Sequence, residues 1–342
     1  MIDSLNESLS HDDGCLVVVS FFITHQEALS KLKAQWAMRN DDHSQVLGRN
    51  RDNVKAVPHE EFGGSIALVD PSHLERGFLA EIEIPLAFGM CLNARDNSLY
   101  VTNGTTLSKV VGGRCIRTLN NPLFNDLHSL TPSTSGNLMV ASTGTDSILE
   151  VDFEDASCVY WDWLATERGY GIRGDGSHRR IDRKCNYQSI MTTTPEHTTH
   201  LNTALNDLPH RILATLFHQG ELIEIKKESK QSRVVLSGLK SPHNIRRRRN
   251  GFMVCDTRAN QVLLLDESLH IEASLKADFN WVQDAIELVD GYIVADSNHD
   301  RLILLDHSGK TSSVMQYPVN SRKIASMEVV TESQARNIFF QS

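Results

Sequence analysis

The sequence predicts an all-β chain that closes into a six-bladed propeller. Three observations carry this prediction: a strand motif repeats at the spacing of one blade, each repeated unit holds four short strands, and the two chain ends hold complementary partial units. The clearest copies are GFMVCDTRANQVLLLD at residues 251–266 and GYIVADSNHDRLILLD at residues 291–306. Each is two apolar, β-branched strands joined by a short polar loop, which is typical of a β-hairpin.

Weaker copies of this hairpin begin at Ser98, Asn137 and Arg211. A further strand precedes each copy, with the sequences FGMCL, DLHSL, THLNT, PHNIR and QDAIE. A fourth strand, such as VYWDW or IEASL, follows most copies. Because four short strands make one blade, we expect five blades between residues 85 and 317.

The two chain ends supply the sixth blade. The tail IASMEVV at residues 324–330 is expected to be its inner strand, and CLVVVSFF, SIALVD and LAEIEI its second, third and fourth strands. Pairing of the tail with residues 15–22 would close the ring and remove the open sheet edges. We therefore expect a single domain over residues 1–342, with insertions at about residues 26–64 and 164–198.

Composition excludes several classes of protein. A net charge of −9 disfavours nucleic-acid binding, which relies on clustered lysine and arginine. No apolar stretch is long enough to span a bilayer, and the first residues do not resemble a signal peptide. The six cysteines contain no C-x-x-C pair. We expect a cytoplasmic protein with a small-molecule substrate and neither nucleic-acid nor membrane partners.

Three histidines fall at matching places in successive inner strands: His128 in DLHSL, His200 in THLNT and His243 in PHNIR. Asp284 in QDAIE aligns with them. Inner strands flank the propeller axis, so these side chains are expected to converge there and to bind a divalent metal ion, with zinc first among the candidates. Asp284 is expected either to be a ligand, orienter or general base, or to make ordinary inner-strand hydrogen bonds. The alternative is three unrelated core histidines.

Both insertions leave the face on which the histidines begin their strands, so they are candidate lids. The second insertion is basic, and Arg168, Arg179 and Arg180 are expected to bind an anionic substrate. Tyr170 and Tyr187 are expected acids or bases. A solvated loop without a role in binding is the alternative.

CDTRANQVLLLD and ADSNHDRLILLD resemble NHL repeats, which supports the propeller. With LHSL and SPHN, the chain also resembles the peptidyl-α-hydroxyglycine α-amidating lyases, which implies zinc on His128, His200 and His243. That family also uses an arginine and a tyrosine near the metal, for which Arg258, Tyr170 and Tyr187 are candidates.

The segments DLHSL, THLNTAL and SPHNIR are similar to those of arylsulfate sulfotransferases, which carry sulfate on a histidine. LATLFHQG lacks the arginine that this family places there. We therefore expect a metal-dependent lyase or isomerase acting on a small anionic molecule. Sulfotransfer through a histidine is the second expectation, and a non-catalytic interaction propeller is the third.

Overall fold

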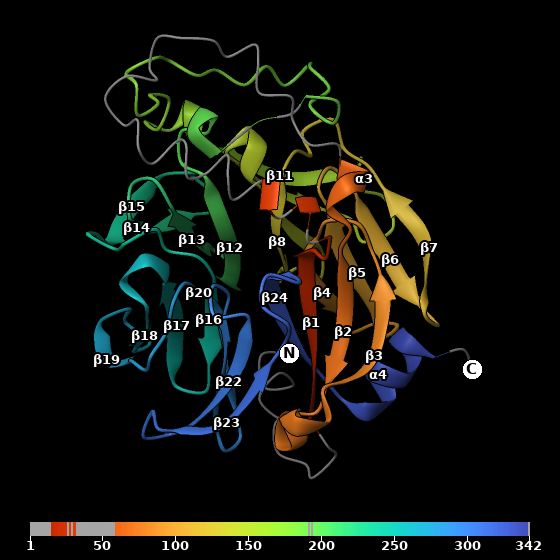
Figure 1. The fold of residues 1–342 in the computed structure, drawn as a ribbon. Coiled ribbons are helices and arrows are strands. Elements are labelled where there is room, and N and C mark those ends of the chain that lie inside the picture. The colour runs from red at the N-terminus through yellow and green to blue at the C-terminus, as the bar shows by residue number, and fades with distance from the viewer. Residues whose placement is uncertain are drawn as a thin grey trace.

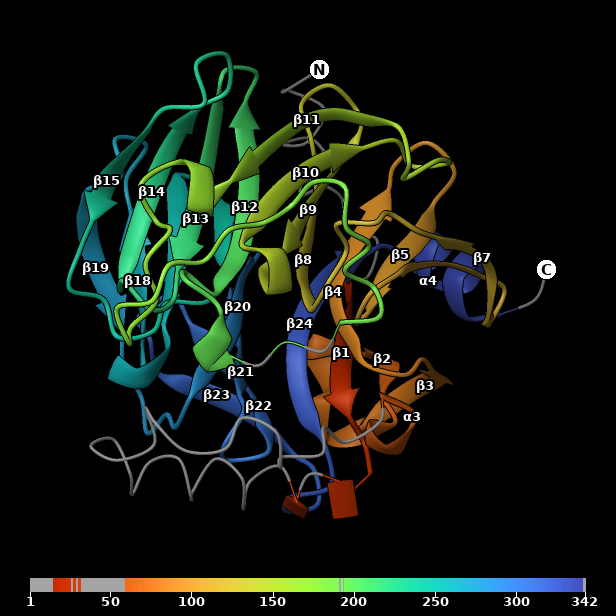
Figure 2. The same cartoon turned by 90° about the horizontal axis from the view of Figure 1, so that it is seen from above.

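A computed structural model describes residues 15–25, 27–28, 30–31, 59–190, 192 and 194–340. In these residues the strands form six four-stranded antiparallel sheets arranged as blades around a central axis (Figures 1 and 2). The six-bladed, mostly β propeller that the sequence predicts is therefore confirmed. Most of the first insertion, including residues 32–58, lies outside the described residues.

The blades are numbered along the chain, and the first strand of each is the one beside the axis. Blades one to three contain β4 (Ala87–Asn93), β5 (Ser98–Asn103), β6 (Leu107–Val111) and β7 (Arg114–Leu119); β8 (Leu127–Pro132), β9 (Leu138–Ser142), β10 (Ser147–Val151) and β11 (Val159–Leu164); and β12 (Leu201–Leu208), β13 (Arg211–Leu216), β14 (Glu221–Lys226) and β15 (Ser232–Leu236). Blades four to six contain β16 (Ile245–Arg248), β17 (Gly251–Asp256), β18 (Gln261–Leu265) and β19 (Ile271–Leu275); β20 (Val282–Leu288), β21 (Gly291–Asp296), β22 (Arg301–Asp306) and β23 (Thr311–Gln316); and β24 (Lys323–Val330), β1 (Leu16–Ile23), β2 (Ser65–Val69) and β3 (Phe78–Glu83).

Blade six joins the two ends of the chain. β24 pairs antiparallel with β1, with Leu16 opposite Val330 and Ser20 opposite Ser326. This confirms the predicted pairing of the tail with the first strand. The chain then ends in α4 (Glu332–Phe339), which begins with a capping box between Thr331 and Gln334 and packs on blade one.

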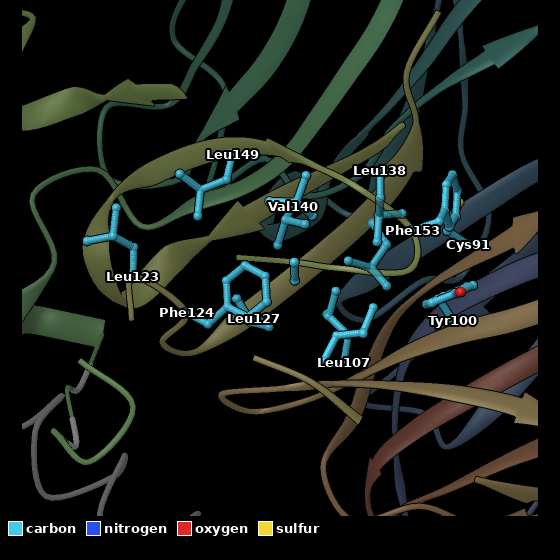
Figure 3. Close-up of a cluster of buried hydrophobic side chains, with 14 of the residues drawn as sticks. Cys91, Tyr100, Leu107, Leu123, Phe124, Leu127, Leu138, Val140, Leu149 and Phe153 are labelled. Carbon is cyan, nitrogen blue, oxygen red and sulfur yellow. The ribbon is translucent and has the colours of Figure 1, made fainter. Parts of the chain in front are cut away.

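The core lies between neighbouring blades. Figure 3 shows one such interface, in which Tyr100 and Leu107 of blade one pack with Leu138, Val140 and Leu149 of blade two. All five side chains are fully buried, and burial of one leucine contributes about 1.5–3 kcal/mol. The six sheets are thus held as a ring by apolar layers, which fixes the positions at which the inner strands begin.

Candidate functional site

The inner strands of blades one to five begin with the same backbone feature. A residue that precedes the strand has a positive φ, which is 52° at Leu86, 47° at Asp126, 47° at His200, 56° at Ser241 and 70° at Trp281. It directly precedes the strand in four of these blades, and Ser241 lies four positions before the start of β16. A β-bulge follows, in which two residues lie opposite one residue of the second strand. This repeated bend turns side chains at the strand start toward the axis.

The positions of the four site residues relative to this bulge differ from the predicted alignment. His128 and His243 do share one position, the first residue of the bulge. His200 instead takes the preceding positive-φ position, and Asp284 follows the bulge residue Gln283. The expectation of one shared position is therefore wrong for His200 and Asp284. An alignment of the strand sequences cannot show which residue is the extra one in each bulge.

Asp146, which is fully buried in the loop after β9, fixes the backbone of His200. Its carboxylate accepts hydrogen bonds from the backbone amides of Thr198, Thr199 and His200 at 2.8, 2.9 and 3.0 Å. Burial alone would raise the pKa of Asp146, but the Arg179 guanidinium and these donors hold that pKa below its usual value. Arg179 is itself buried against Asp146 and the Gly144 carbonyl, which gives its guanidinium structural partners, and its predicted contact with substrate stays a prediction.

Seven rings follow one another around the axis at the strand starts, and we call this set the aromatic arc. Successive ring centroids lie 4.2 to 5.8 Å apart. The arc runs in the order Phe22, Phe88, His128, His200, Phe217, His243 and Trp281. His128 and His200 are in direct ring contact at 4.8 Å, whereas Phe217 lies between His200 and His243.

Hydrogen bonds fix the tautomers of His128 and His243. His128 Nδ1 lies 2.9 Å from the Asp126 carbonyl oxygen, which can only accept, so Nδ1 carries the proton. His243 Nδ1 lies 2.8 Å from Thr257 Oγ1, and the hydroxyl of Thr257 already donates to the Val282 carbonyl. In the neutral form of each ring, Nε2 is then an unprotonated lone pair.

A longer relay fixes the tautomer of His200. Asn125 Nδ2 donates to two backbone carbonyls, so its Oδ1 accepts from the Thr192 hydroxyl at 2.7 Å. Thr192 Oγ1 therefore accepts from His197 Nε2 at 3.0 Å, which leaves His197 Nδ1 as an acceptor. His200 Nδ1 donates to His197 Nδ1 at 2.7 Å, and Nε2 of His200 becomes the third unprotonated lone pair.

Burial keeps the rings of His197, His200 and His243 neutral. It lowers the pKa of His243 to about 3 and that of His197 to about 4, and it places the pKa of His200 well below the usual range. Neighbouring imidazoles lower the pKa of His200 further. Neutral imidazole is the form that ligates metal ions.

Among the described residues, the group whose ligand atoms all lie within 4.8 Å of one another, and which could hold a metal ion, is Asp126, His197 and His200. The predicted set of His128, His200 and His243 does not meet this distance limit. The Asp126 carboxylate lies 3.9 Å from His197 Nε2 and 3.7 Å from His128 Nδ1. His197 therefore belongs to the site. From the sequence, His197 is a weaker ligand candidate, because its spacing of three from His200 directs it to a different part of the barrel mouth.

Asp284 is occupied away from the histidines. Its oxygens accept two hydrogen bonds from Arg246, at 2.8 and 2.7 Å, and others from the amides of Ala285 and Met327. The carboxylate is fully buried. The sequence left several roles open for Asp284, and these hydrogen-bond partners favour ordinary inner-strand hydrogen bonding. Arg246 lies within strand β16.

The connection between β11 and β12 crosses the face where the inner strands begin (Figure 2). Within it, Tyr170 packs against Trp163 with ring centroids 6.2 Å apart, and Tyr187 accepts a hydrogen bond from the Asp182 amide through its hydroxyl. These contacts hold both tyrosines to the connection and its flanking blades. Arg168 and Arg180 are exposed, so their predicted binding of an anion stays a prediction.

Arg258 is the predicted site residue that lies beside the aromatic arc. Its guanidinium carbon is 5.7 Å from the Phe217 ring centroid and 5.6 Å from that of Trp281. The residue is exposed, and its charge contributes to the low pKa of His243. Sequence reasoning missed Phe217 and Trp281. Trp281 directly precedes the inner strand β20, whereas Phe217 follows the end of β13 and so lies away from the strand starts on which that reasoning relied.

No family model matches the sequence, and no curated protein matches it. A protein of unknown function from Bacteroides caccae has a similar structure, with 17% identity and a TM-score of 0.55 over 78% of this chain and 95% of that one. A chain of the nidogen/laminin complex has 10% identity and a TM-score of 0.53 over 78% and 94%. Virginiamycin B lyase from Staphylococcus aureus is also a structural neighbour, with 11% identity and a TM-score of 0.45 over 68% and 70%. Because the identities are below 25%, the first two likenesses show the fold alone. Within the described residues, no helix is long and apolar enough to cross a membrane.

Proposed function

We propose that the protein is a metal-dependent enzyme of the lyase or isomerase type, acting on a small anionic molecule where the inner strands begin. The ligands we assign to a divalent ion, with zinc first, are the Nε2 atoms of His128, His200 and His243. The observation that carries the proposal is the pattern of hydrogen bonds at Nδ1, which leaves all three Nε2 atoms unprotonated.

Such an arrangement is typical of metal-binding histidines. A ligating imidazole usually donates its other N–H to a carbonyl, hydroxyl or carboxylate, which fixes the ring and its tautomer. When bound, a divalent ion would polarise an oxygen of the substrate.

Asp126 is our choice for the group that moves a proton. Its side chain is 39% exposed, and it lies beside both His128 and His197. It thereby takes the place that the sequence expectation gave to Asp284. The anionic group of the substrate would meet Arg258, which is the exposed cation beside His243.

The test is the metal content of tag-free protein, measured by inductively coupled plasma mass spectrometry after dialysis against zinc. We expect one ion per chain in the wild type and less than a tenth of that in His128→Ala, His200→Ala and His243→Ala. His270→Ala is the matched control, because the His270 side chain is 82% exposed on blade four. Wild-type protein that binds no ion would overturn the proposal.

A second candidate ligand set is the group of Asp126, His197 and His200, in which His197 would have to exchange its hydrogen bond with Thr192 or His200 for the metal ion. The same experiment separates the two sets. Loss of the ion in Asp126→Asn and His197→Ala, with retention in His128→Ala and His243→Ala, would assign the ion to that group and overturn the three-histidine set.

A further inference from the structure

One end of the aromatic arc combines apolar rings with an exposed positive charge. Phe217 and Trp281 are half-buried, and they flank His243 with ring centroids 5.4 and 5.8 Å from it. The guanidinium of Arg258 lies against both rings, at 5.7 and 5.6 Å. Three side chains from three consecutive blades thus meet at one place beside the axis.

The charge of Arg258 is left for a ligand. The buried arginines Arg179 and Arg246 end on acids, namely Asp146 and Asp284. Arg258 makes ring contacts but no ion pair with a described residue, and its backbone amide is held by the Lys240 carbonyl. A guanidinium stacked on two rings keeps its N–H donors in a fixed plane, which suits two-point binding of a carboxylate.

The rings specify the rest of the ligand. Half-buried aromatic faces bind planar apolar groups by stacking, and they do so best where one end of the site is apolar and the other polar. The opposite side of the arc holds Asp126, whose charge disfavours a second anionic group there.

We propose that Arg258, Phe217 and Trp281 form a subsite for an aromatic carboxylate, with the carboxylate on Arg258 and the ring against Phe217 and Trp281. This deepens the proposed function by naming the class of its substrate, and it rests on that function only for the claim that the ligand is turned over. Binding itself needs no metal ion.

The experiment is isothermal titration calorimetry of EDTA-treated protein with 2-naphthoate, 2-naphthamide and cyclohexanecarboxylate. We expect 2-naphthoate to bind at least ten-fold more tightly than either of the other two probes, which is about 1.4 kcal/mol. Arg258→Gln should remove the preference for naphthoate over naphthamide. Trp281→Leu should remove the preference for naphthoate over cyclohexanecarboxylate.

Arg336→Gln on α4 is the control, because that side chain is 79% exposed on the last helix. Thermal melts followed by circular dichroism show whether each variant is folded, and Arg258→Lys keeps the charge if Arg258→Gln does not fold. Equal binding of the three probes, or naphthoate binding that survives Arg258→Gln, would overturn the subsite. The protein is metal-free in this assay, so the calorimetry gives the same result whether or not the protein has a metal site. Failure of the proposed metal site would be detected only by the metal analysis.

Discussion

Asp146→Asn should destabilise the protein by about 3–5 kcal/mol, the usual effect of breaking a buried ion pair by removing one partner. The variant keeps the shape of the side chain but leaves the charge of Arg179 buried without its partner. It also places an NH2 group where Asp146 now accepts hydrogen bonds from the amides of Thr198, Thr199 and His200. Urea unfolding followed by circular dichroism measures the free energy of unfolding.

Asp155→Asn is the matched control, because Asp155 is exposed and bonds only within its own turn, so we expect a change within about 0.5 kcal/mol. The double variant Asp146→Asn with Arg179→Met should recover part of the loss, since the unpaired charge is gone. The reasoning is refuted if the free energy of unfolding of the single variant Asp146→Asn lies within about 1 kcal/mol of the wild-type value.

The lowered pKa of Asp146 also gives a pH dependence. A carboxyl group whose folded pKa lies below its unfolded value contributes stability above the unfolded value, near 3.9, and loses it as the pH falls through the folded pKa. The wild type should therefore lose more stability than Asp146→Asn between about pH 4 and pH 2. Unfolding curves at pH 6, 4 and 2.5 test this sign, and parallel losses in the two proteins would contradict it.

Three further predictions address other parts of the molecule. Gly89→Ala should destabilise the protein by about 1–3 kcal/mol and weaken metal binding, because an added Cβ would lie 2.6 Å from Ser129 Cα beside His128; Gly174→Ala, with open space around it, should do neither in the same unfolding and metal assays. Thr257→Val should weaken zinc affinity about ten-fold in a competition titration, because His243 Nδ1 loses its 2.8 Å partner and keeps only the Ser241 carbonyl at 3.2 Å to orient the ring; an unchanged affinity would separate Thr257 from the site. Truncation after residue 321 removes β24, and hydrogen exchange should then show no protected core; a protected core would mean that five blades suffice.

The fold could be predicted because its determinants are repeated. Alternating apolar strands recur with one spacing, and the closing pair of β24 and β1 follows from complementary partial blades at the chain ends. His128 and His243 could be matched for the same reason, since both lie at the start of an inner strand and share the bulge position.

The remaining site residues depend on contacts that have no repeat. The positive φ of His200 is set by Asp146, which lies 54 positions before it, and by a connection found in one blade only. Arg179 in the same connection looks like one of several exposed bases until its buried carboxylate partner is known. The pairing of Arg246 with Asp284 is equally non-local, because the two residues belong to different blades.

The closure of blade six also constrains how the chain reaches its native state. Ser20 Oγ contacts the carbonyl oxygen of Ser326, a separation of 306 positions, so the last native contacts to form span nearly the whole chain. Until β24 is synthesised, the apolar strand LVVVSFFI of β1 has an unpaired edge, which is the kind of surface that recruits other chains. Loop-closure entropy makes such distant pairing slow, and we expect ring closure to be the rate-limiting step of folding. A higher protein concentration during refolding should accordingly favour pairing of β1 with the β24 of another molecule over pairing with its own β24.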